Sequence, residues 1–219
     1  MKPDFEIKKV KCYNVDCMEF MKIIPDNFYE LAIVDPPYGI GAGSNNFKNG
    51  TSKGNTIGYR EIDWDSIIPD KSYFTELKRI SKHQIIWGGN YFAHLLEPSR
   101  GWIVWDKGTG KNSYADGELA YTSFDKVLKI IKKTWVGANA KDTVVRIHPT
   151  QKPVALYKWT LTKYAKFGDK ILDTHGGSFS SACACLDMGF DIDICEIDKE
   201  YFDNAVNRLK NNVQEYLEF

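Results

Sequence analysis

The chain has 219 residues, of which 43% are apolar and 26% charged, an ordinary balance for one good-sized globular domain over residues 1–219. Its 29 basic and 29 acidic residues cancel, so the net charge does not indicate a nucleic-acid partner, although a local basic face stays compatible with it. The five cysteines form no CxxC pair, the four histidines lack metal-ligand spacing and no apolar run could span a membrane, so we expect a cytoplasmic, metal-free protein.

Strand-like and helix-like segments alternate along the chain, which predicts an α/β fold around a mainly parallel sheet. Strands are predicted over residues 8–15, 30–35, 84–89, 102–107, 119–124, 143–148, 170–174 and 191–197. Helices are predicted over residues 17–24, 71–82, 90–97, 152–165, 178–188 and 199–217.

The segment NVDC, residues 14–17, is the first along the chain that could belong to a site. Asp16 ends a predicted strand and precedes a predicted helix. A helix cap explains this position adequately, because an aspartate accepts hydrogen bonds from the free N–H groups of a first turn. A contact to a bound ligand is the alternative.

The segment AIVDPPYGI, residues 32–40, ends an apolar run with an acid, two prolines and a tyrosine. Proline cannot continue a central strand, so the strand must stop at Asp35, and open α/β sheets bind ligands at that end of their strands. The Asp35 carboxylate and the Pro36 carbonyl could accept the two N–H groups of an exocyclic amine on a nucleobase. Tyr38 offers a face for base stacking, worth roughly 1–3 kcal/mol. A stiff turn with a surface tyrosine is the alternative.

Two irregular stretches each follow a predicted strand end. Residues 39–63 come directly after the DPPY corner, and residues 107–118 follow a later strand. Long loops of this kind are commonly functional lids. We expect both stretches to gather over the same site.

The segment HPTQKP, residues 148–153, precedes a predicted helix. Pro153 suits a first helical turn, and Lys152 together with the free N–H groups there could bind a carboxylate. The alternative is an ordinary helix start with a solvated lysine.

Residues 170–190 read as a strand that ends at Asp173, a glycine-containing turn and a helix. Such a turn lets the backbone approach a ligand closely, although the segment does not match the dinucleotide fingerprint G-x-G-x-x-G. Glu196 ends the next strand about 20 positions past Gly177, where an acid can accept hydrogen bonds from ribose hydroxyls. A tight turn and a helix cap are the alternatives, and Asp198 is the better cap candidate of the two acids.

In this order, these segments resemble the β-class amino-methyltransferases, which methylate exocyclic amines of DNA bases with S-adenosylmethionine. The resemblance extends from Asp16 to about Leu209. It implies a doubly wound, mostly parallel, seven-stranded sheet of the Rossmann-like methyltransferase type, circularly permuted, in a single methyltransferase domain. It also implies S-adenosylmethionine as cofactor, DNA as partner, segment 106–147 as a small target-recognition region, and a homodimer as one arrangement.

The resemblance assigns roles residue by residue. Catalysis on the target amine falls to Asp35, Pro36, Pro37 and Tyr38. The cofactor is expected to contact Asp16, Cys17, Asp35, Thr150, Lys152, Asp173, Thr174, Gly177, Ser178 and Glu196. Asp16 would lie near the adenine, Glu196 would hold the ribose, and Thr150 with Lys152 would lie near the carboxylate. Phosphate contacts are expected from Lys48, Lys53, Lys107 and Lys111.

Two features of the motifs leave alternatives open. The DPPY form usually accompanies transfer to adenine N6, while cytosine N4 is the alternative because both amines need the same acceptors. Phe179 occupies the usual second glycine of the cofactor loop, where a ring would block close approach or a Cβ would forbid a positive φ, unless Gly176 lets the turn shift in compensation. That departure favours, as a further alternative, a degenerate methyltransferase fold that binds DNA or a partner. Methylation of RNA or of a protein amide is a third.

Overall fold

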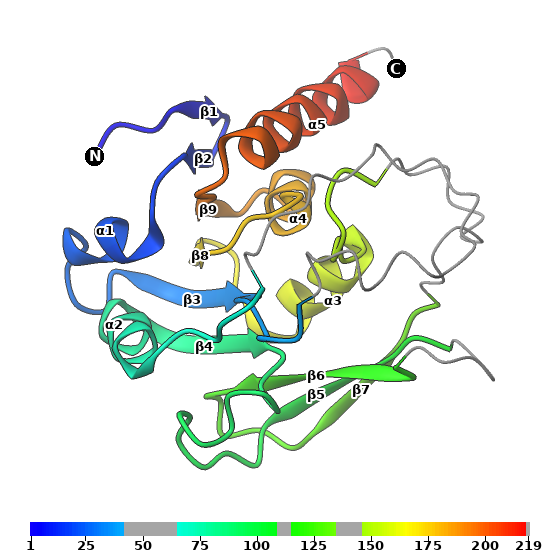
Figure 1. The fold of residues 1–219 in the computed structure, drawn as a ribbon. Helices are drawn as coiled ribbons and strands as arrows, with labels where there is room; N and C mark the ends of the chain where they lie inside the picture. Colours follow the sequence, from blue (N-terminus) through cyan, green and yellow to red (C-terminus); the bar gives the residue numbers. More distant parts are fainter. Residues whose placement is uncertain (42–64, 109–114, 135–145, 218–219) are drawn as a thin grey trace.

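The computed structural model describes residues 1–41, 65–108, 115–134 and 146–217 (Figure 1). In these ranges the strands join into one mixed sheet of nine strands, in the order β1-β2-β9-β8-β3-β4-β6-β5-β7. The strands are β1 (Phe5–Ile7), β2 (Val10–Tyr13), β3 (Tyr29–Val34), β4 (Ser81–Trp87), β5 (Trp102–Asp106), β6 (Gly117–Thr122), β7 (Lys129–Lys132), β8 (Lys170–Asp173) and β9 (Asp191–Cys195). The helices are α1 (Cys17–Lys22), α2 (Lys71–Ile80), α3 (Val154–Tyr164), α4 (Ser180–Met188) and α5 (Lys199–Leu217).

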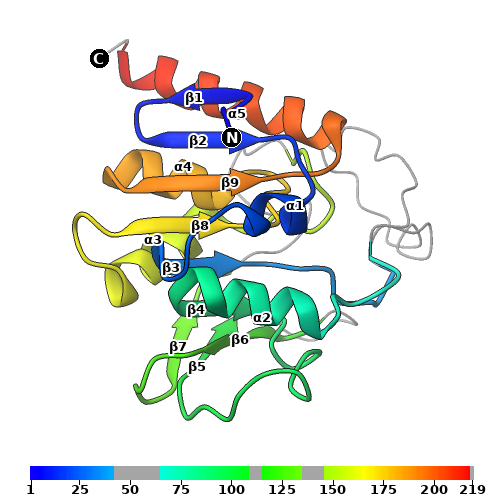
Figure 2. The ribbon, with the colours of Figure 1, turned by 90° about the vertical axis from the view of Figure 1, so that its left-hand side faces the viewer.

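The predicted α/β fold with a mostly parallel sheet is confirmed. Strands β2, β9, β8, β3 and β4 are parallel to one another, whereas β1 and β6 run antiparallel to their neighbours. Helices α1 and α2 cover one face, and α3, α4 and α5 cover the other (Figures 1 and 2). Because both faces are covered, the central strands read as continuous apolar runs.

Strand β3 shows how the two cores are separated. Leu31 and Ile33 point to the core under α3, α4 and α5, while Ala32 and Val34 point to the core under α1 and α2. This alternation follows from the two-residue period of a strand. The strand ends at Val34, so Asp35 lies just past the carboxyl end of this central strand.

The sheet has nine strands where seven were expected, and the two additional strands lie at its edges. Strand β1 forms a hairpin with β2 around Lys8, whose φ is 53°. Strand β7 pairs with β5, and its side chains are largely exposed. Edge strands need no continuous apolar run, so sequence patterning misses them. The strand predicted over residues 143–148 is wrong in its described part, since residues 146–148 form no strand of the sheet.

The helix predicted over residues 90–97 is also wrong. The segment consists of turns, in which the N–H groups of Tyr91 and Leu95 donate to the carbonyls three residues earlier. Phe92 is fully buried, and Tyr91 lies against the ring of Tyr38. These contacts with distant residues override a helix-like local pattern. No helix in the described part of the chain is both long and apolar enough to cross a bilayer.

Candidate active site

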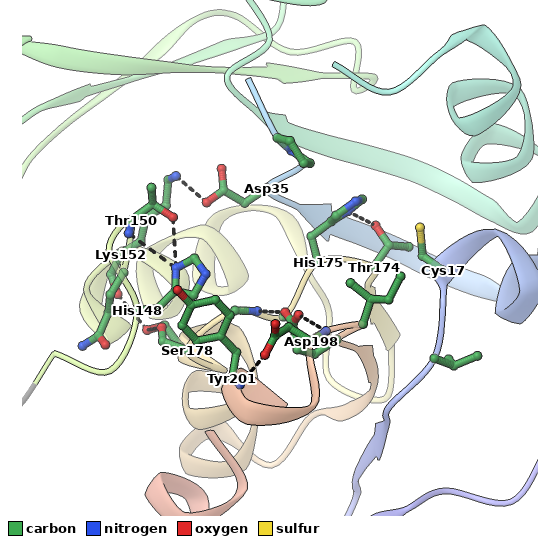
Figure 3. A pocket seen from close by; sticks show the side chains of 18 of the residues that line it. Cys17, Asp35, His148, Thr150, Lys152, Thr174, His175, Ser178, Asp198 and Tyr201 are labelled. Atoms are coloured by element: carbon green, nitrogen blue, oxygen red, sulfur yellow. Dashed lines mark hydrogen bonds and ion pairs between the residues drawn. The ribbon is translucent and has the colours of Figure 1, made fainter. Parts of the chain in front are cut away.

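A pocket lies at the carboxyl ends of β2, β3, β8 and β9, the sheet edge where a ligand site was expected (Figure 3). The cavity volume that the centre of a water molecule can reach is about 240 Å³. Its wall includes ten residues predicted for the site, namely Asp16, Cys17, Asp35, Pro37, Thr150, Lys152, Thr174, Gly177, Ser178 and Glu196. Pro36, Tyr38 and Asp173 are not among the lining residues.

Asp173, at the end of β8, was expected to contact the cofactor but lies beneath the loop that lines the pocket. Its Oδ1 accepts the backbone N–H of His175 at 3.1 Å, and its Oδ2 accepts the hydroxyl of Ser181 at 2.5 Å. Burial raises the pKa of Asp173 to about 7, although these two hydrogen bonds oppose the rise. The Asp173 carboxyl group therefore fixes the shape of the loop, and the residues that follow it line the pocket.

Phe179 does not obstruct the pocket. Its backbone adopts a φ of 57°, and its ring is fully buried in the core, edge-on to Phe202 with ring centres 5.8 Å apart. Gly176 makes room for it, because a Cβ at position 176 would lie 2.5 Å from the Phe179 ring. The expectation that this residue blocks the ligand or forbids a positive φ is therefore wrong. The left-handed backbone costs about 1–3 kcal/mol, which the buried ring offsets.

Glu196 links the loops after β8 and β9. Its Oε2 accepts the backbone N–H of Gly177 and its Oε1 accepts that of Asp198, each at 2.8 Å. A carboxylate oxygen can accept two hydrogen bonds, so both oxygens can also accept from a ligand in the pocket. Burial raises the pKa of Glu196, and the backbone N–H groups oppose this. The prediction that Asp198 caps the last helix is confirmed, since its Oδ1 accepts the N–H groups of Glu200 and Tyr201.

Asp16 combines the two interpretations that the sequence left open. Its Oδ1 accepts the N–H of Met18 at 2.7 Å, so it caps α1, and it also lines the pocket. Cys17 lines the pocket beside it, and burial raises the pKa of its thiol to about 12. This thiol is therefore uncharged and contributes surface rather than a nucleophile.

Two histidines that sequence reasoning left unassigned line the pocket (Figure 3). The Nδ1 of His148 is 3.1 Å from the hydroxyl of Thr150, and the Nδ1 of His175 is 2.9 Å from that of Thr174. Burial lowers the pKa of His148 to about 3 and that of His175 to about 4, and the Lys152 charge contributes to the first. Both rings are therefore neutral near pH 7. Their place inside HPTQKP and DTHGG was a signal that could have identified them.

The ammonium group of Lys152 forms an ion pair with the Asp35 carboxylate, although it was expected near the carboxylate of a ligand. Its Nζ is 2.5 Å from Asp35 Oδ2 and 3.1 Å from Glu118 Oε2, on strand β6. Its side chain is only 4% exposed. Burial raises the pKa of Asp35, and the charge of Lys152 opposes that rise. Glu118 was missed by sequence reasoning, because nothing in the segment ADGELAY distinguishes its acid from a solvated one.

Tyr38 is engaged through both its hydroxyl and its ring. The hydroxyl donates to Asp35 Oδ1 at 2.5 Å. The ring stacks on Tyr91 with centres 4.9 Å apart and planes 16° from parallel. Gly88 lies so close that a Cβ there would be 2.2 Å from the Tyr38 ring. One face of the Tyr38 ring, which was expected to offer a surface for a base, is thus covered by Tyr91.

The lysines proposed for phosphate contact are only partly described. Lys48, Lys53 and Lys111 lie outside the described residues. Lys107 follows β5 and is paired with Glu118 Oε1 at 2.6 Å, with its side chain 19% exposed. Its ammonium group also lies 5.1 Å from the centre of the Trp105 ring. In the described part of the chain, no group of three or more His, Cys, Asp or Glu side chains could hold a metal ion.

Known proteins resemble this chain in sequence and in fold. The Type II methyltransferase M.HpaI of Haemophilus parainfluenzae is 26% identical in an alignment that is 243 residues long. The alignment covers 92% of this chain and 74% of that protein. The solved M1.HpyAVI-SAM complex has a TM-score of 0.60 at 20% identity, covering 91% of this chain and 98% of the other. The cytosine-N4-specific PvuII DNA methyltransferase has a TM-score of 0.62 at 13% identity, covering 99% and 95%. At these identities the two structures establish the Rossmann-like methyltransferase fold.

A family model described as DNA methylase, of the N6/N4 methyltransferase type, matches residues 63–207. This match includes Lys152, Asp173, Gly177 and Glu196, all of which take part in the pocket or its supporting loop. Because it covers more than half of the chain, the chain belongs to the N6/N4 DNA methylase family.

Proposed function

We propose that the chain transfers a methyl group to N6 of adenine in DNA, with the target base flipped out of the duplex toward Asp35. The observation that carries this proposal is the Asp35 carboxylate, which lines the pocket and is directed by Lys152 and Tyr38. The DPPY form of the corner favours adenine. Transfer to cytosine N4 is the second candidate, favoured by the likeness in fold to the cytosine-N4-specific PvuII enzyme.

The residues of the pocket fit S-adenosylmethionine. The buried carboxylate of Glu196 retains acceptor capacity on both oxygens and suits the ribose hydroxyls. Asp16 and Cys17 form the part of the wall proposed for the adenine, and Thr150 and Ser178 offer hydroxyl groups for the methionine end. When bound, the cofactor supplies an electrophilic methyl group on a sulfonium sulfur.

Asp35 acts on the target amine in two ways. Its carboxylate and the Pro36 carbonyl accept the two N–H groups, which withdraws the nitrogen lone pair from the ring and aims it at the methyl group. Fixed electrostatic groups of this kind contribute about 10²–10³-fold to a rate. This nitrogen would receive the methyl group of the bound cofactor, and the methylated amine would then have a proton to lose. Since burial raises the pKa of Asp35, its carboxylate is a suitable acceptor for that proton.

Tyr38 and Tyr91 have different roles beside the target base. Tyr38 orients Asp35 through its hydroxyl, so its ring is fixed behind the acceptor. Tyr91 covers that ring and is itself 41% exposed, so its outer face is the aromatic surface available to a flipped base. The expected base stacking is therefore assigned to Tyr91.

Calorimetric titration with S-adenosylmethionine, followed by transfer of labelled methyl groups to DNA of mixed sequence, tests the proposal. Digestion of the product to nucleosides should yield N6-methyladenine. N4-methylcytosine would assign the second candidate, and label on RNA or on protein would contradict both. Asp35→Ala should keep the fold yet lose about 10²–10³-fold in rate. Retained activity in that variant would sink the mechanism.

A further inference from the structure

We propose that Glu118 is a positioning residue of the active site, which acts through Lys152 to set the orientation and charge of Asp35. The inference rests on the proposed function, since it concerns the carboxylate that receives the target amine. Glu118 belongs to β6, in the part of the sheet beyond β4, and is 83 positions from Asp35 along the chain.

The ammonium group of Lys152 forms a bridge between the two carboxylates. It is 2.5 Å from Asp35 Oδ2 and 3.1 Å from Glu118 Oε2, and it donates to the Tyr38 hydroxyl at 3.0 Å. These are three acceptors for the three protons of a lysine ammonium group. With its side chain 4% exposed, Lys152 has little water to replace any of them.

Lys107 completes the arrangement on the far side of Glu118. It lies 2.6 Å from Glu118 Oε1, so each oxygen of this carboxylate faces a different ammonium group. Two carboxylates and two ammonium groups together carry no net charge. A neutral cluster of this kind avoids an uncompensated buried charge, which would cost several kcal/mol.

The other titratable groups near the cluster do not replace either charged partner. The Tyr38 oxygen is 3.5 Å from Glu118 Oε2, too far for a strong hydrogen bond. His148 is neutral because burial holds its pKa at about 3. Among the described residues, the groups that interact electrostatically with Asp35 or Lys152 include Tyr38 beside Asp35, Glu118 on β6, His148 before α3, Tyr157 on α3 and Asp173 at the end of β8.

This geometry gives the two outer residues opposite effects on Asp35. Without the charge of Glu118, Lys152 pairs with Asp35 alone, which lowers the pKa of Asp35 and weakens it as an acceptor of amine protons. Without the charge of Lys107, Glu118 draws Lys152 toward itself, which raises the pKa of Asp35. Both changes break the same Lys107–Glu118 ion pair. If the loss of that pair alone mattered, the pKa of Asp35 would shift in the same direction in both variants.

The experiment compares Glu118→Gln with Lys107→Gln, two nearly isosteric changes. In protein labelled with ¹³C at the aspartate carboxyl carbon, the Asp35 signal is assigned with Asp35→Asn and followed through a pH titration. We expect its midpoint to fall in Glu118→Gln and to rise in Lys107→Gln. Lys78→Gln, which removes an exposed pair with Glu97, should leave it unchanged. Shifts of the same sign in the first two variants, or no shift, would overturn the inference.

Methyl transfer under saturating DNA and cofactor supplies the second readout. Glu118→Gln should lower kcat by about 10-fold or more, move the acid limb of its pH profile to lower pH and keep the cofactor affinity. Unchanged kcat and an unchanged profile would overturn the positioning role. A wild-type protein without transferase activity would instead refute the proposed function, while the carboxyl titration would still decide the electrostatic role of Glu118.

Discussion

The two halves of the proposed active site, one for the cofactor and one for the base, hold their carboxylates by different means. In the cofactor half, formed by the loops after β2, β8 and β9, Asp16, Asp173, Glu196 and Asp198 all accept backbone N–H groups. In the base half, formed by Asp35, Tyr38, Glu118 and Lys152, the carboxylates are held by side chains. Backbone donors are fixed by the local fold, whereas a side-chain network depends on every member. The cofactor half should therefore tolerate substitutions that the base half does not.

The largest effect is expected where the base half loses its central cation. Lys152→Met leaves the Asp35 carboxylate without its ammonium partner and leaves Glu118 with Lys107 as its remaining cation. Removal of one partner from a buried pair costs about 3–5 kcal/mol, so we expect a loss of that size in the free energy of unfolding near about pH 8. The loss should shrink toward about pH 5.5, since the two carboxyl groups then take up protons.

Urea denaturation at the two pH values measures this change. Lys78→Met provides the matched control, because it removes an exposed lysine from a 3.4 Å pair with Glu97 and should change stability little. Equal losses in the two variants would show that the Lys152 network has no special importance.

A loss of similar order is expected at Phe179, but without any effect on the cofactor. Phe179→Gly removes a fully buried ring, at a cost of about 3–5 kcal/mol reduced by the relief of the positive φ. Phe202→Ala, which removes the ring packed against it, is the matched core variant. Thermal denaturation and cofactor titration should show lower stability and unchanged affinity in both. Tighter cofactor binding in Phe179→Gly alone would revive the interpretation of a degenerate loop.

An intermediate effect is expected from the acid of the cofactor half. Glu196→Gln replaces a charged acceptor facing the pocket with a neutral one. Hydrogen bonds to charged groups contribute about 1.5–3 kcal/mol, so the Kd for S-adenosylmethionine should rise roughly 10- to 100-fold. Glu200→Gln, an exposed change at the start of α5, is the calorimetric control. An unaltered Kd would remove Glu196 from the cofactor site.

The smallest effect concerns the pH dependence of stability. Burial keeps the pKa of His148 at about 3, against an ordinary value of 6.5. As the pH falls below about 6.5, the unfolded chain binds a proton that the folded chain does not, so stability decreases by up to about 1.4 kcal/mol per pH unit. In His148→Gln, the free energy of unfolding should decrease less per pH unit than in the wild type, as measured by denaturation curves recorded from about pH 6.5 to about pH 5. A wild-type slope in His148→Gln would show that this imidazole does not contribute to the pH dependence.

The same contrast explains what the sequence could predict. Asp16 and Glu196 each follow a strand and accept the N–H of a residue two positions further on, so local patterns identify them. The pairing of Asp35 with Lys152 joins residues 117 positions apart, and Glu118 joins them from a third strand. No local pattern encodes which distant acid faces a given lysine.

Local patterns failed in two other places for related reasons. The residues around Tyr91 and Phe92 look helical, but their packing against Tyr38 and the core determines a series of turns. Phe179 was expected to obstruct the ligand unless Gly176 compensated, and the sequence could not decide between the two because the space beside Gly176 is defined only by the tertiary fold. In both cases tertiary packing decided the outcome against a local preference.

The parallel pairing of β2 with β9 joins Val10–Tyr13 to Ile192–Cys195. The pocket wall needs both strands, because Asp16 follows one of them and Glu196 follows the other. During synthesis from the amino terminus, the DPPY corner is therefore made long before any place for the methyl donor exists. The pocket can close only after β9 has left the ribosome and paired with a strand made near the beginning, a long-range step of the kind that slows folding.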